Sequence, residues 1–197
     1  MVAMNTTNYT PLLLVLLASS AAVASAQTSV SGQTAATPSG LSYNNVSASY
    51  SRIGVSGVSG RADSWELTAN ALVGSSNVLI SASTTIGGDL GNGTDEVSVG
   101  YVCKDLAYGT DAIVQVGSDE TYGLVLRRKL GNDFEVSAHY TRAAGANIYG
   151  LFVGCDISKA VTVGLAYELT SRVDFSAFGY SANSKLSAWT ASVRYNF

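Results

Sequence analysis

The feature that most constrains this chain is an alternation of apolar and polar residues that returns along most of its length. The final stretch shows it clearly. Its apolar positions are Trp189, Ala191, Val193, Tyr195 and Phe197, and its polar positions are Thr190, Ser192, Arg194 and Asn196. A period of two sends the two sets to opposite faces of a β-strand. The alternation therefore predicts strands with one apolar and one polar face.

Ten such stretches follow one another from residue 43 onward, separated by turn-like or more variable connections. They are Asn45–Ser51, Ser64–Val73, Val78–Ile86, Glu96–Lys104, Ala112–Gly117, Tyr122–Leu130, Phe134–Thr141, Ile148–Cys155, Val161–Leu169 and Trp189–Phe197. The hairpin-scale spacing favours a meander in which strands pair in chain order. The fifth stretch is the shortest, and eight strands would result if it and a neighbour were loop.

The composition agrees with strands and disfavours membrane-spanning helices. Charged residues make up 13% of the chain, and the mean hydropathy is +0.22. Beyond the N-terminus, however, no run approaches the roughly 18 apolar residues that a spanning helix needs. The 20 Gly and 2 Pro residues suit sheets joined by turns. A net charge of −3 gives no electrostatic reason to expect a nucleic-acid partner.

The apolar positions have the character of a lipid-facing surface. None carries a charge before Arg128, at the end of the sixth stretch. A charge facing lipid costs roughly 2–4 kcal/mol at the bilayer midplane and little at the interface. We therefore predict an all-β fold, a transmembrane antiparallel up-and-down β-barrel of 10 strands, with 8 as the alternative.

The aromatic residues sort by depth into two belts if odd strands run in one direction and even strands in the other. Aromatic rings favour the two membrane interfaces. At one rim we expect Tyr50, Trp65, Tyr122, Tyr140, Tyr149, Tyr167 and Trp189, and at the other rim Tyr101, Phe134, Tyr195 and Phe197.

From about Tyr43 to Phe197, together with its leader, the chain resembles small bacterial outer-membrane β-barrel proteins of the porin-like type. The closing strand carries the most specific likeness: Val193, Tyr195 and Phe197 are similar to the C-terminal assembly signal of that class. The resemblance implies recognition by the barrel-assembly machinery and contact with outer-membrane lipid. We expect a monomer without a nucleic-acid partner.

The N-terminus has the features of an export signal. A short apolar core, Leu12–Ala18, precedes Ala24-Ser25-Ala26, a small-residue cleavage pattern. We predict a signal peptide at 1–26, a flexible lead-in at 27–42 and the barrel at 43–197. No Lys or Arg precedes the apolar core, so an uncleaved amphipathic leader is the alternative.

The polar positions would face the lumen of the barrel. Its charged and titratable members are Glu66, Glu96, Lys104, Arg127, Glu135, His139, Glu168 and Arg194. Eight strands leave a lumen just filled by side chains, and general pores need about sixteen. We therefore favour a rigid network of interior ion pairs over the alternative, a narrow charge-lined pathway for a small solute.

No residue pattern points to catalysis, to a cofactor or to a metal. His139 is the sole histidine, and beside Glu135 it could act as a base, but no clear carboxylate pair accompanies it. Cys103 and Cys155 would lie on opposite sides of the barrel, so we expect no disulfide between them. The sequence thus predicts no enzyme and no cofactor.

The function that we predict is that of an integral outer-membrane barrel with a structural or surface role, or a narrow pore. A small-solute porin is one alternative, and a secreted soluble all-β binding domain is another. The long connections Ile53–Ala62 and Thr170–Lys185 are candidate contact surfaces, although the second could equally fold over the barrel mouth.

Overall fold

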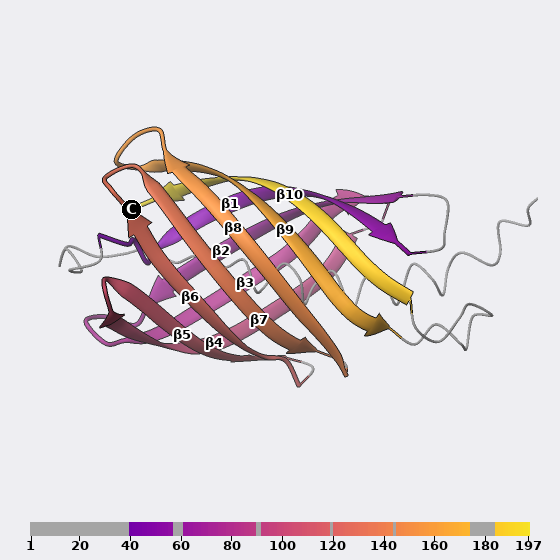
Figure 1. Ribbon diagram of the computed structural model, residues 1–197, viewed down its shortest axis with the longest axis horizontal. Helices are drawn as coiled ribbons and strands as arrows, with labels where there is room; N and C mark the ends of the chain where they lie inside the picture. The colour runs from indigo at the N-terminus through magenta and orange to yellow at the C-terminus, as the bar shows by residue number, and fades with distance from the viewer. Residues whose placement is uncertain (1–39, 57–60, 90–91, 119, 144, 174–183) are drawn as a thin grey trace, which may run out of the picture.

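The computed structural model describes residues 40–56, 61–89, 92–118, 120–143, 145–173 and 184–197 (Figure 1). These residues form ten antiparallel strands. The strands are β1 (Asn45–Val55), β2 (Arg61–Leu72), β3 (Val78–Gly88), β4 (Asn92–Ala107), β5 (Thr110–Gly117), β6 (Tyr122–Leu130), β7 (Phe134–Ala143), β8 (Ala146–Asp156), β9 (Val161–Val173) and β10 (Ser184–Asn196).

The sheet closes on itself, because β1 pairs with both β2 and β10 and every other strand pairs with its neighbours in chain order. The closing pair runs from Asn45 opposite Asn196 to Val55 opposite Leu186. Closure leaves no free strand edge, which is the condition for a sheet to sit in lipid. The predicted all-β, up-and-down barrel of ten strands is confirmed.

Most strands extend beyond the stretches in which the sequence alternates. β4 begins at Asn92 and ends at Ala107, and β10 begins at Ser184. Register shifts accompany these extensions, for example between Cys103 and Ala107 and between Ser184 and Leu186. An irregular ladder still pairs its backbone while losing the period of two, so alternation alone underestimates strand length.

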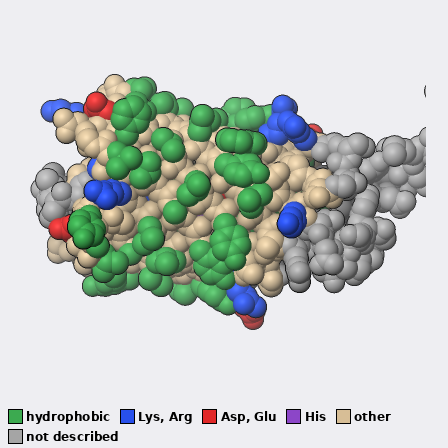
Figure 2. Space-filling view, viewed as in Figure 1, with side chains coloured by type: hydrophobic (Ala, Val, Ile, Leu, Met, Phe, Trp, Pro, Cys, Tyr) green, Lys and Arg blue, Asp and Glu red, His purple; other side chains and the backbone are tan. Residues whose placement is uncertain are grey.

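The two faces of the sheet have opposite character. Apolar side chains point outward and stay exposed, among them Leu151 at 64% and Val97 at 56%, whereas Arg127 and Glu135 inside are 0% exposed. Figure 2 shows apolar side chains spread over the middle of the outer surface, with Lys and Arg side chains toward its two ends. This distribution is the reverse of that in a soluble protein. The apolar side chains face outward, where lipid can cover them, and polar and charged side chains face the lumen.

We call the rim that holds Asn45 and Asn196 the near rim, and the opposite one the far rim. The chain ends at the near rim, where the C-terminus is marked in Figure 1. Part of the interior at this end is an apolar cluster. Leu41 and Tyr43, which precede β1, are buried against inward side chains of β3 to β6, namely Leu79, Val102, Ile113 and Val125.

In the part of the chain that the structure describes, no helix is long and apolar enough to span a bilayer.

Candidate functional site

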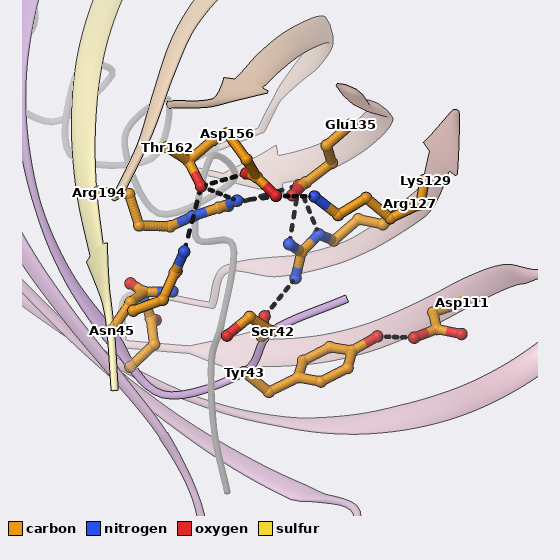
Figure 3. Close-up of polar contacts among 12 residues, drawn as sticks. Ser42, Tyr43, Asn45, Asp111, Arg127, Lys129, Glu135, Asp156, Thr162 and Arg194 are labelled. Carbon is orange, nitrogen blue, oxygen red and sulfur yellow. Dashed lines mark hydrogen bonds and ion pairs between the residues drawn. The ribbon is translucent and has the colours of Figure 1, made fainter. Parts of the chain in front are cut away.

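Glu135 of β7 is the centre of a buried ion network close to the rim that holds Asn45 and Asn196 (Figure 3). Its Oε1 accepts hydrogen bonds from Nε and Nη2 of Arg127 at 3.0 and 2.8 Å. Its Oε2 accepts from Nη2 of Arg194 at 2.6 Å. Arg127 comes from β6 and Arg194 from β10, so the carboxylate joins the closing strand to strands on another side of the lumen.

Tyr43 closes the near end of this network. Its ring lies below two cations, with the Arg127 guanidinium carbon 5.3 Å and the Lys104 Nζ 5.7 Å from the ring centroid. Its hydroxyl donates to the Asp111 carboxylate. Burial, reinforced by the hydrogen bond to Asp111 and opposed by Arg127, raises the pKa of the Tyr43 hydroxyl well above its ordinary value. The hydroxyl thus remains a neutral donor.

A second set of polar contacts continues around the near end. Lys129 pairs with Asp156, and Thr162 Oγ1 donates to Asp156 Oδ1 at 2.7 Å. Arg194 Nη2 donates to Thr162 Oγ1 at 3.2 Å, which connects this set to Glu135. Inside a low-dielectric lumen, such connected charges rigidify the wall only if each has a partner.

The half of the lumen toward the far rim is acidic instead. His139 Nε2 lies 3.3 Å from Glu168 Oε1, and both side chains are 1% exposed. Glu66 Oε1 accepts from Thr68 Oγ1 at 2.8 Å and lies near enough to Glu168 for their charges to interact. A Cβ at Gly150 would lie 2.1 Å from His139 Cε1, so only glycine lets the imidazole approach β8 this closely.

The structure thus divides the eight predicted lumen residues into two groups. Seven of them are buried and Lys104 is partly buried. Arg127, Glu135, Arg194 and Lys104 gather near Tyr43, whereas His139 lies against Glu168 and not beside Glu135. Glu96, at 6% exposure, lies on β4 opposite Ser83 of β3.

Several interior residues were missed from the sequence. The most important are Leu41 and Tyr43, because they precede the first alternating stretch. The sequence does contain a pattern that could have predicted their position in the lumen. Apolar residues occupy lumen-facing positions of four successive strands, namely Leu79, Val102, Ile113 and Val125. Such a group inside a polar lumen needs an apolar partner.

The predicted belt residues lie on the outer surface. At the far rim three cross-strand ring pairs form: Tyr50 with Trp65, Tyr140 with Tyr149, and Tyr167 with Trp189, with centroids 5.0, 5.4 and 4.6 Å apart. Tyr122 is also exposed there. At the near rim, Tyr195 and Phe197 have centroids 6.4 Å apart, and Tyr101 and Phe134 are exposed. Their placement at membrane interfaces stays a prediction.

Charged residues on the outer surface lie toward the two rims, at or near the level of these rings. Arg52 follows Tyr50 on the outward phase of β1 and makes a two-point salt bridge with Asp63 of β2, at 2.9 and 3.0 Å. Arg128 is exposed near the near rim. The charges therefore flank the apolar middle of the wall, where a charge costs least.

The remaining chemistry-bearing residues form no site of their own. Within the described ranges, no group of three His, Cys, Asp or Glu side chains is placed to hold a metal ion. Cys103 of β4 and Cys155 of β8 are free thiols on strands that do not neighbour each other. The side chains of the His139–Glu168 pair are each 1% exposed, so the pair lies in the interior and not on an open surface.

The closed sheet, the apolar outer surface and the polar, side-chain-filled interior together define a small transmembrane β-barrel of the outer-membrane type.

No protein-family model and no curated protein sequence matches the chain. Solved structures with a similar shape include the KdgM porin, at 15% identity over 77% of this chain and 99% of the porin, with a TM-score of 0.43. Others are the outer membrane protein Omp33 of Acinetobacter baumannii (12% identity, 78% and 98% coverage, TM-score 0.36) and Ail, the attachment invasion locus protein of Yersinia pestis (12%, 78% and 96%, 0.32). The class stated above follows from the two faces of this barrel and not from these proteins.

Proposed function

We propose that the protein is an integral bacterial outer-membrane β-barrel with a closed lumen, which serves as a structural or surface-exposed membrane protein and not as a solute channel. One observation carries this proposal. Leu41 and Tyr43 fill the near end of the barrel, and Arg127 covers Tyr43 while its Nη1 donates to the Ser42 carbonyl at 3.4 Å.

The interior behind this segment supports the same function. Val102, Ile113, Arg127 and Glu135 lie inside the wall with 0% of their surface accessible to water. A hydrated ion would have to displace these side chains and break the contacts of Glu135. The His139 and Glu168 side chains are each 1% exposed, which supports a closed lumen in this half as well.

Further parts of the proposal concern export and assembly. An even strand number places the start of β1 and the end of β10 at one rim, as in bacterial single-chain barrels. We propose that residues 1–26, which lie outside the described residues, direct export, and that the β10 end directs assembly into the outer membrane. We further propose that the protein is a monomer without enzymatic activity.

Conductance in planar bilayers tests the closed lumen. We expect the purified, folded protein to insert without producing stable current steps, because the interior side chains leave no continuous water path. Flotation of the same sample with liposomes must show that the protein has entered the bilayer. Reproducible ohmic steps from the unmodified protein would contradict the proposal and favour a small-solute porin.

A further inference from the structure

At the far rim, the outer surface carries a groove of about 410 Å³ between β1, β2, β9 and β10. Its lining combines cationic with aromatic and aliphatic side chains. Three are cationic, Arg52, Arg61 and Lys185, and five are aromatic or aliphatic, among them Tyr167, Leu169 and Trp189.

The strand register explains why these side chains meet. Arg52 lies opposite Trp189, and Trp189 lies opposite Tyr167, with which it stacks at 4.6 Å. Gly54, on the outward phase of β1, lies opposite Arg61 on one side and Ser187 on the other. With no side chain at Gly54, the surface is hollowed between the cations.

The charge of the groove is positive. Arg52 is compensated by Asp63 through their two-point salt bridge. Arg61 and Lys185 are exposed, and neither forms a salt bridge within the described ranges of the chain. Two positive charges without a salt-bridge partner among the described residues therefore line the groove, next to the surface that faces lipid, and Arg61 lies close enough to Asp63 for their charges to interact.

We propose that this groove binds a membrane lipid whose phosphate-bearing headgroup has a net negative charge. Arg61 and Lys185 contact the phosphate, and an acyl chain lies along Tyr167, Leu169 and Trp189. A guanidinium and an ammonium are the side-chain groups that best complement phosphate. The apolar side chains of the groove favour a lipid over a free phosphate ion as the ligand. A free phosphate ion would leave these apolar side chains without a contact. The inference goes beyond the closed lumen and does not depend on it.

The two tryptophans provide a direct test, because Trp189 lies in the groove and Trp65 lies at the same rim on the other side of β1. Trp65→Phe leaves Trp189 as the only reporter, and Trp189→Phe leaves Trp65. Each variant is placed in phosphatidylcholine vesicles that contain a small fraction of bromine-labelled phosphatidylglycerol or bromine-labelled phosphatidylcholine. We expect the anionic lipid to quench Trp189 preferentially, whereas Trp65 shows little preference.

Charge substitutions identify the phosphate ligands. A basic residue at an anionic lipid surface contributes about fivefold in affinity at low salt, so Arg61→Gln and Lys185→Gln should each reduce the preference by about that factor. Both side chains are exposed, so folding should persist. Lys159→Gln, at an exposed position between β8 and β9 at the near rim, is the matched control and should leave the preference unchanged.

Three outcomes would overturn the proposal. Equal quenching of Trp189 by both labelled lipids would show that the groove does not select phosphate-bearing anionic lipid. An equal preference at Trp65 would reveal general enrichment around the barrel. Loss of the Trp189 preference with inorganic phosphate, but not with the same ionic strength of chloride, would show that the cations bind a free ion.

Discussion

At the scale of single residues, Glu135 shows how the interior is held together. One carboxylate accepts from two guanidinium groups that belong to different sides of the barrel, and its side chain is 0% exposed. Buried charges cost free energy unless they are paired and hydrogen-bonded. The network is therefore strongly cooperative, because removing its only shared acid leaves two buried cations facing each other.

Glu135→Gln should destabilise the folded barrel by about 3–5 kcal/mol, the range found when one partner of a buried ion pair is removed. Equilibrium unfolding by urea in lipid vesicles measures the loss.

The outer salt bridge supplies the matched control for this substitution. Asp63→Asn removes an acid of similar contact geometry from the Arg52 pair, whose side chains are 50% and 30% exposed. Solvent screens such a pair, so the change in unfolding free energy should be much smaller. Equal losses for the two variants would mean that burial does not govern the strength of the Glu135 network.

At the scale of elements, β10 has two tasks. Its outward side chains carry the resemblance to an assembly signal, and its backbone closes the barrel against β1. The ladder continues past its last strand residue, because the Phe197 backbone N–H donates to the Asn44 carbonyl at 3.2 Å. Phe197 thus lies next to the segment that fills the near end of the lumen, an arrangement that the alternation of β10 does not predict.

Deleting Phe197 should lower the yield of folded protein in the outer membrane several-fold while leaving export through the inner membrane intact. The reason is that the deletion removes the terminal ring, which lies 6.4 Å from Tyr195, and the last backbone contact to Asn44. Cell fractionation combined with gels that separate folded from unfolded barrel measures both steps. Phe197→Tyr keeps the ring and should restore the yield; unchanged yield after the deletion would refute the role of this residue.

At the scale of the whole molecule, the outer surface decides between the barrel and the alternative of a soluble all-β domain. A soluble domain would bury residues such as Leu151 and Val153, which here are 64% and 52% exposed on the outward face of β8. Large contiguous apolar surfaces on a monomer mark contact with a partner or with lipid. A closed sheet with no free edge agrees with lipid as that partner.

Folded protein in cold dodecyl sulfate should therefore migrate differently from the same sample after boiling, because a closed barrel keeps its backbone hydrogen bonds together until it is heated. Electrophoresis of the two samples side by side makes the comparison. A single position in both lanes would favour the soluble domain.

The sequence by itself favoured ten strands over eight and determined the up-and-down order and which side chains face outward, because a period of two is a local property of each strand. It also named most of the interior charges, although it missed Asp111, which is 0% exposed. Only the tertiary structure decided which of them meet: Glu135 with Arg127 and Arg194, and His139 with Glu168. Closure and strand tilt set the distances across the lumen, and those quantities depend on all ten strands together. For the same reason the structure alone places Leu41 and Tyr43 inside the barrel, since their partners lie on four other strands.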